Sequence, residues 1–355
     1  MILLVTYDVR RPGGIERLSV QVFEQLQQLG LQPRLLATRH LGPGVLGRWL
    51  GRLWFLLQLL WWLPQAKSVF SMHVLLLKPL KLRALFPALA ARPLYCWLHG
   101  IEVWGQALAA AGRDLRACTA LAASSTFTAQ QVRDGLPACP PITVVHPCSD
   151  LKFPDQIPPP GLPLRLLTVA RLDAGERYKG HDQILNALHL LKQQSDLDPA
   201  LRWIVVGDGN DRTRLQEKAL RLGVAAQIDW RGRLSDQQLI EEFGRCSVFV
   251  MPSGFSIDAA GQATGEGFGI AYLEAAMAGR ASIGALSGGQ QDLIMDGETG
   301  WLVSSSAPVL ANLLASLSLK GSLFAERGKA AYLRAKTGFT PRQQGVQLAV
   351  LLVEQ

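Results

Sequence analysis

The chain has 355 residues, of which 48% are hydrophobic and 18% are charged. This composition excludes an intrinsically disordered chain and a fibrous repeat, and the length suits two domains. The formal net charge of +8 arises within residues 1–150, which hold fifteen Lys or Arg against seven Asp or Glu; the remainder is balanced.

Five cysteines, an odd number without C-x-x-C spacing, argue against a disulfide framework and against a zinc site. We expect reduced, mostly buried thiols in a reducing compartment. The chain begins with Met1-Ile2-Leu3-Leu4-Val5, without the basic leader and cleavage motif of a signal peptide. These features predict a cytoplasmic protein.

Apolar runs and helical periodicity alternate in the first half of the chain. Apolar residues recur at helical spacing from Ile15 to Leu29, and Gly30 stands where a C-terminal cap belongs. Alternation of strands and helices indicates a parallel sheet with crossover helices. The predicted strands are residues 1–7, 34–37, 68–72, 94–98, 121–123 and 142–145.

The second half repeats this alternation after a proline-rich stretch, residues 154–163, which we interpret as a linker. Its predicted strands are residues 164–170, 203–206, 228–230, 248–251, 281–284 and 300–303. The fold class is therefore α/β, with two doubly wound Rossmann-like domains facing a central cleft, at residues 1–153 and 164–341. Ligands of such domains bind at the carboxyl ends of the strands.

Residues 25–101 contain no carboxylate but nine cations, and they include Trp49, Trp54, Trp61, Trp62 and Trp97. Basic side chains mixed with tryptophan suit an anionic membrane surface. Nucleic acid is the other partner that such charge suits, but no nucleic-acid motif accompanies it. We predict contact with the inner face of a membrane and no nucleic-acid binding.

Residues 45–63 have about the length of a membrane span, but Arg48, Arg52 and Gln58 interrupt them. Charges at mid-bilayer are costly, which disfavours a transmembrane helix. A buried helix of the first domain and a helix lying in the membrane interface remain as alternatives.

The most specific pattern is a pair of glutamates, Glu266 and Glu274, around Gly267-Phe268-Gly269-Ile270. A glycine-flanked turn opens into a helix there, and the N–H groups of a helix start suit phosphate oxygens. Carboxylates accept hydrogen bonds from vicinal hydroxyls. Backbone amides that can bind an anion, flanked by two carboxylates that can bind diols, predict a site for a sugar nucleotide.

Two cations, Arg171 and Lys179, follow the predicted strand at residues 164–170. They are placed to neutralise a diphosphate leaving group, although a solvated charged loop is the alternative. Gly13-Gly14, after the first strand, forms a second candidate phosphate-side turn.

His99 follows the strand at residues 94–98 and can reach a transferring sugar or an acceptor; a purely structural histidine is the alternative. Asp196 and Asp198 have the spacing of some metal sites, but they lie in a polar loop, so we predict no metal. Gly207-Asp208-Gly209 lacks the third glycine of a dinucleotide fingerprint, and we interpret it as a strand-to-helix turn.

With these residues assembled, the chain resembles a retaining glycosyltransferase of family four, which has the GT-B fold. The resemblance covers nearly the whole chain, and the order and spacing of its motifs carry it. The matching segments are residues 12–17, 99–102, 124–128, 169–172, 178–182, 206–209, 266–275 and 296–300.

The resemblance implies a role for each matching position. Glu266 would hold hydroxyls of the donor sugar, Glu274 the ribose, and the amides of 267–270 the sugar and diphosphate. Arg171 and Lys179 would stabilise the departing diphosphate, and His99 would lie beside the reacting sugar. The backbone near Gly232-Arg233 would contact the base, and the helix at 342–355 would cross back onto the first domain.

The resemblance implies a UDP- or GDP-sugar donor, no metal, and a glycan or lipid-linked acceptor held by the first domain. One departure is an insertion, residues 254–265, before Glu266. Two alternatives to a transferase remain, namely a sugar-nucleotide epimerase and a non-catalytic sugar-nucleotide-binding protein of the same fold.

Overall fold

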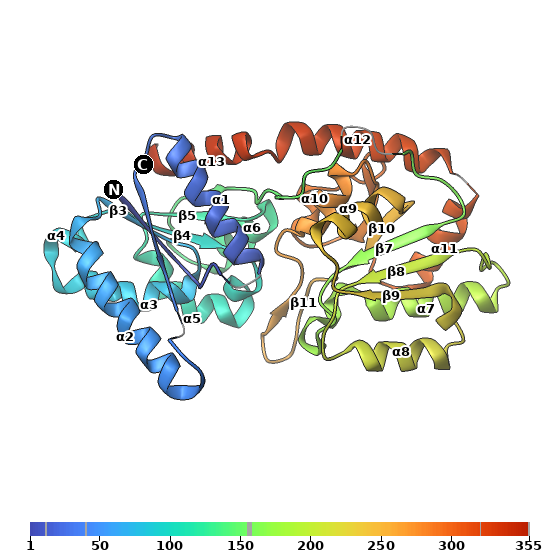
Figure 1. Cartoon of the computed structure of the whole chain (residues 1–355), viewed down its shortest axis with the longest axis horizontal. Helices are drawn as coiled ribbons and strands as arrows, with labels where there is room; N and C mark the ends of the chain where they lie inside the picture. Colours follow the sequence, from blue (N-terminus) through green and yellow to red (C-terminus); the bar gives the residue numbers. More distant parts are fainter. Residues whose placement is uncertain (11–12, 40, 155–157, 320, 354–355) are drawn as a thin grey trace. The chain divides into compact units, whose positions relative to one another are not determined.

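The computed structural model describes residues 1–10, 13–39, 41–154, 158–319 and 321–353. The chain forms two compact units, each with its own sheet and core (Figure 1). Unit 1 comprises Met1–Cys148, Ala259–Gln262 and Thr340–Gln355, and unit 2 comprises Ser149–Asp258 and Ala263–Phe339.

The sheet of unit 1 has six parallel strands in the order β2-β1-β3-β4-β5-β6. The order reverses between β1 and β3, and the carboxyl ends of such neighbours form the switch point where doubly wound sheets bind ligands. The strands are β1 (Ile2–Thr6), β2 (Pro33–Ala37), β3 (Ser68–Ser71), β4 (Leu94–Leu98), β5 (Ala120–Ala123) and β6 (Ile142–Val144).

Helices α1 (Gly14–Gln28) and α13 (Pro341–Val353) lie side by side against one face of this sheet, where Leu26 and Leu348 join a buried apolar cluster (Figure 1). Gly30 adopts φ +74° after α1 and donates its N–H to Gln27, which confirms the predicted cap. The other helices of unit 1 are α2 (Gly44–Trp62), α3 (Leu77–Leu80), α4 (Pro87–Ala90), α5 (Gly105–Arg116) and α6 (Thr126–Gly135).

The sheet of unit 2 also has six parallel strands, in the order β14-β13-β10-β7-β8-β9. Its switch point lies between β7 and β10, because the chain leaves β7 for β8 on one side and returns to β10 on the other. The strands are β7 (Arg165–Val169), β8 (Arg202–Val206), β9 (Ile228–Gly232), β10 (Val248–Met251), β13 (Ser282–Ala285) and β14 (Gly300–Val303).

Two apolar clusters cover the two faces of this second sheet. One contains Trp203 and side chains of α7, α8 and α11, and the other contains Phe249 and side chains of α9 and α10. This arrangement confirms the doubly wound architecture. The helices are α7 (His181–Gln193), α8 (Arg212–Arg221), α9 (Asp236–Arg245), α10 (Ile270–Met277), α11 (Ala307–Ser318) and α12 (Ser322–Gly338).

All twelve predicted strands form, with ends displaced by two residues at most. The five cysteines are free thiols, and all but Cys139 are buried. The insertion at 254–265 contains an unpredicted antiparallel hairpin, β11 (Ser256–Ile257) and β12 (Ala263–Thr264). Its tip belongs to unit 1, where Gln106 N donates to Gly261 O at 2.8 Å. Residues 155–157 of the predicted linker lie outside the described residues.

Helix α2 buries only one narrow stripe, formed by Gly47, Gly51, Phe55 and Leu59. A Cβ atom on Gly47 would lie 2.0 Å from the carbonyl oxygen of Gly42, so the close approach requires glycine. A buried core helix does not fit, because large apolar side chains are exposed along α2. They are Val45, Leu46, Trp49, Leu50, Leu53, Trp54, Leu57, Leu60 and Trp61.

Within the described residues, no single helix combines the length and the apolar composition needed to cross a membrane. The pair α11 and α12, bent by 107°, passes that test only when taken together, by length and composition alone.

Candidate active site

The chain segments that follow β7 and β10 pack against each other at the switch point of unit 2. After β7, the 3₁₀ segment Ala174–Lys179 ends at Gly180, which has φ +87°. A Cβ atom on Gly180 would lie 2.6 Å from Cγ of Pro252, and Gly254 N donates to Tyr178 O at 2.9 Å. The fold thereby brings Lys179 to the segment that leads to Glu266.

Lys179 and Glu266 form an ion pair in which Nζ lies 2.6 Å from Oε2, with side chains only 14% and 11% exposed. Burial by itself would lower the pKa of Lys179, but the charge and hydrogen bond of Glu266, together with Tyr178 and Glu176, outweigh it, so the pKa is raised above its ordinary value. Lys179 is therefore charged at neutral pH. The ion pair thus joins two residues that the sequence indicated for different reasons, Glu266 for sugar hydroxyls and Lys179 for the diphosphate.

Glycine geometry fixes the start of α10. Gly269 has φ +88°, and a Cβ atom there would lie 2.5 Å from the ring of Tyr272. Gly289 N donates to Glu266 O at 2.7 Å, and a Cβ atom on Gly289 would lie 2.1 Å from Gly267 O. The positive end of the α10 dipole therefore lies beside the Lys179–Glu266 pair, in an arrangement that suits an anion next to a polyol.

Glu274 lies within α10 and is 8% exposed. Its Oε1 accepts a hydrogen bond of 3.1 Å from the Ser149 hydroxyl, which in turn accepts one of 3.2 Å from Leu151 N. Ser149 was not among the predicted site residues, because a serine before a proline-rich stretch carries no distinctive pattern. Phe268 is buried, and Ile270 is the first residue of α10.

Arg171 lies in the same neighbourhood as the Lys179–Glu266 pair but is more exposed. Its guanidinium is paired with Glu176, and its side chain is 76% exposed. Burial raises the pKa of Tyr178 to about 12, and the charge of Lys179 opposes that rise. Arg233 is exposed after β9 and forms no ion pair with a described residue.

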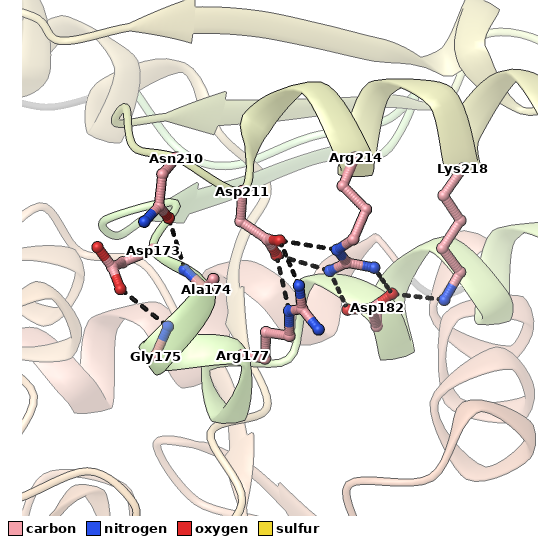
Figure 2. Close-up of polar contacts among 9 residues, drawn as sticks. All are labelled: Asp173, Ala174, Gly175, Arg177, Asp182, Asn210, Asp211, Arg214 and Lys218. Atoms are coloured by element: carbon pink, nitrogen blue, oxygen red, sulfur yellow. Dashed lines mark hydrogen bonds and ion pairs between the residues drawn. The ribbon is translucent and has the colours of Figure 1, made fainter.

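An ion-pair network holds the segment that carries Lys179 (Figure 2). Asp211, which precedes α8, accepts hydrogen bonds from Arg177 and Arg214, and Asp182 accepts them from Arg214 and Lys218. Burial opposes ionisation of Asp182, but Arg214 and Lys218 lower its pKa to about 2. The hydrogen bonds of Arg214 likewise lower the pKa of Asp211. The network joins the Ala174–Lys179 segment and α7 to α8.

In unit 1, His99 follows β4 and is held at several points. Its Nε2 lies 2.7 Å from Met72 O, and its backbone N–H donates to Glu102 Oε1 at 2.5 Å. Its ring stacks on His73 with a centroid distance of 5.9 Å. His73 was not among the predicted site residues, although its position directly after a predicted strand was a usable signal.

Gly14 is the first residue of α1, and a Cβ atom there would meet no described atom within 4 Å, so packing of the described residues does not require glycine. Residues 11 and 12 of that predicted turn lie outside the described residues. Gly207, with φ +132°, lies in a turn between β8 and α8, as the sequence predicted. The described residues contain no cluster of three or more His, Cys, Asp or Glu suited to a metal ion.

The two doubly wound sheets define the GT-B fold class, and known structures share this fold. Sucrose-phosphate synthase from Thermosynechococcus elongatus superposes with a TM-score of 0.79 at 15% identity, covering 100% of this chain and 99% of that one. HepE of Anabaena in complex with UDP and glucose gives a TM-score of 0.71 at 18% identity, with both chains fully covered.

The family model for glycosyl transferases group 1 matches residues 152–334, and the chain belongs to this family. A GDP-mannose-dependent α-(1-6)-phosphatidylinositol monomannoside mannosyltransferase of Mycolicibacterium smegmatis is 31% identical over 183 residues. That match covers 49% of this chain and 44% of the relative, so this chain matches less than half the length of that protein. The chain thus combines membership of the glycosyl transferases group 1 family with the GT-B fold.

Proposed function

We propose that this protein transfers a sugar from a nucleoside diphosphate to a hydroxyl of a lipid-linked or surface-glycan acceptor, with retention of anomeric configuration. The Lys179–Glu266 ion pair beside the start of α10 carries the proposal. A carboxylate and an ammonium in one buried pair offer an acceptor to sugar hydroxyls and a cation to the adjoining diphosphate.

Each step of the proposed reaction has a group suited to it. Developing negative charge on the departing diphosphate is stabilised by Lys179, by the exposed Arg171 and by the N–H groups at the start of α10. Glu274, which Ser149 holds in position, accepts hydrogen bonds from the ribose diol. We further propose that the acceptor hydroxyl attacks from the face that the diphosphate leaves, and that no metal is needed.

Nucleotide binding tests this proposal. UDP-glucose or GDP-mannose should raise the melting temperature of the protein, and the matching diphosphate should be released when an acceptor is present. Glu274→Gln should weaken nucleotide binding about ten-fold, the loss of roughly one charge-assisted hydrogen bond. Glu217→Gln, an exposed carboxylate on α8, is the matched control and should bind as the wild type.

The anomeric configuration of the product, read by NMR, tests retention, and activity should persist in a chelator. Failure of every nucleotide sugar to stabilise the protein or to be consumed would overturn the proposed activity. Release of diphosphate without an acceptor and with an altered donor sugar would favour the epimerase alternative instead.

We also propose that α2 docks the protein on the cytoplasmic face of an anionic membrane. The exposed apolar side chains of α2 include Leu46 at 71%, Trp49 at 63% and Trp61 at 68%, and the cations Arg48 and Arg52 lie exposed among them. Tryptophan and arginine on an apolar helix suit the boundary between head groups and acyl chains.

Not every basic residue of the 25–101 segment belongs to the proposed membrane-facing surface. Arg83 is 6% exposed and donates to carbonyl oxygens of Leu89 and Ala90, and Lys81 pairs with Asp114 at 2.7 Å. Trp97 is fully buried in β4. The proposed membrane-facing set is therefore α2, not the whole segment.

Vesicle co-sedimentation tests the membrane proposal. The protein should bind vesicles of phosphatidylglycerol and phosphatidylcholine, less so pure phosphatidylcholine, and salt should weaken the binding. Replacing Leu46, Trp49 and Trp61 together with glutamine should weaken it about ten-fold or more. The control Leu220→Gln, at a position 69% exposed on α8, should change nothing. Equal binding by the triple variant would refute a role for α2.

A further inference from the structure

The loop that follows β13, residues 286–289, has no role in the proposal above, although it lies against the backbone that carries Glu266. Gly289 N donates to Glu266 O at 2.7 Å, and a Cβ atom on Gly289 would lie only 2.1 Å from Gly267 O. Backbone segments in such close contact cannot shift independently. The conformation of the 286–289 loop therefore determines where Glu266 and the start of α10 lie.

The side chain of Gln290 holds this loop closed from inside the fold. Its Nε2 donates to Ala285 O at 2.8 Å and to Ser287 O at 3.0 Å. A carbonyl oxygen can only accept, so both bonds require a donor, and the amide of Gln290 supplies both from a single nitrogen. Gln290 is 0% exposed, so water does not compete for these two bonds.

Packing fixes the stem of the same side chain. A Cβ atom on Gly284 would lie 3.2 Å from Gln290 Cγ and 3.4 Å from the ring of Tyr272, so the two side chains border one glycine. The ring of Tyr272 also borders Gly269, the residue before α10, where an added Cβ would lie 2.5 Å from it. Gln290 therefore has little freedom to turn away from the loop.

The second polar atom of the Gln290 amide argues against a role in stability alone. Its Oε1 bonds no described residue and lies beside Gly288, where an added Cβ would be 2.4 Å away. A buried acceptor without a partner costs free energy. An apolar side chain of the same length would avoid that cost, so the two bonds that Nε2 donates are what glutamine contributes here.

We propose that Gln290 is a positioning residue for sugar transfer, which holds the 286–289 loop so that Gly289 keeps Glu266 and the start of α10 in place. The inference rests on the proposed function, in which Glu266 binds hydroxyls of the donor sugar. A displacement of about 1 Å at a reacting group can cost about 100-fold in rate. Gln290 acts without touching the sugar nucleotide, because its side chain is fully buried.

Gln290→Met removes both donated bonds and the unpaired oxygen, while the side chain keeps its length. We expect this variant to fold with a melting temperature close to that of the wild type. Its rate of diphosphate release from UDP-glucose or GDP-mannose with an acceptor should fall about 100-fold. Gln291→Met, at the exposed neighbouring position, is the matched control and should keep the wild-type rate.

Nucleoside monophosphates separate positioning from a general loosening of unit 2. UMP and GMP carry the ribose, which Glu274 binds in the proposed function, but neither the second phosphate nor the sugar. Whichever of them inhibits the wild type should inhibit Gln290→Met with the same affinity, because the defect is confined to Glu266 and the start of α10. Equal losses in monophosphate binding and in transfer would show a merely structural role and overturn the inference.

Gly289→Ala tests the same contact from the loop itself and does not depend on the stability of Gln290→Met. The added methyl group meets Gly267 O and displaces the loop from Glu266, so transfer should be lost and monophosphate binding kept. Gly338→Ala is the control, because a Cβ atom there would meet no described atom within 4 Å.

Wild-type transfer in either Gln290→Met or Gly289→Ala would overturn the positioning role and leave the proposed function intact. A wild type that neither binds nor consumes any nucleotide sugar would refute the proposed function instead.

Discussion

Replacing Glu266 with glutamine is expected to lower kcat/KM for sugar transfer by about 100- to 1,000-fold, as for other groups preorganised around developing charge. Glutamine keeps the shape of the side chain but removes the charge that pairs with Lys179. The rate of nucleoside diphosphate release at varied donor concentration measures the effect. An unchanged rate would exclude Glu266 from the reaction.

The same substitution leaves the nearly buried Lys179 unpaired, and we expect it to cost about 3 kcal/mol of unfolding free energy. The double variant Glu266→Gln/Lys179→Met removes the unpaired charge and should recover most of that stability. It should not recover activity. If activity returned with stability, the loss in the single variant would have come from misfolding rather than from missing chemistry.

Asp211→Asn should lower the unfolding free energy by about 2 kcal/mol, measured by urea denaturation. Asp211 is 4% exposed and receives four hydrogen bonds from Arg177 and Arg214, but those side chains are 52% and 32% exposed, so water screens part of the loss. Asp208→Asn, whose carboxylate is 50% exposed, is the control and should cost well under about 1 kcal/mol.

The cost of Asp211→Asn should depend on pH in a defined direction. The pKa of Asp211 is lower in the folded protein than its ordinary value of about 4, so its stabilising effect is complete above that value. It is lost as the pH falls through the lowered pKa, because protonation removes the same charge as the substitution. The two proteins should therefore converge in stability in acid. A constant difference down to the lowest accessible pH would contradict this origin.

Sequence alone located the strands of both sheets, because strands buried on both faces appear as uninterrupted apolar runs such as Val248–Met251. It also identified Glu266 and Lys179, since the glycines beside them mark turns and a helix start. It could not state that these two side chains bond each other. They are separated by more than eighty positions and meet only because β7 and β10 are neighbours in the sheet.

The tertiary structure alone decided which side chains are buried, paired or exposed. Basic residues occur throughout the 25–101 segment without any carboxylate, yet Arg83 is buried and Arg48 is exposed. The Nδ1 atom of His73 accepts the backbone N–H of Leu75 and lies within hydrogen-bond distance of the Tyr7 hydroxyl, although Tyr7 is 66 positions away in the chain. Local periodicity determines which elements form, whereas burial and hydrogen-bond direction depend on strand order, and strand order is a property of the whole sheet.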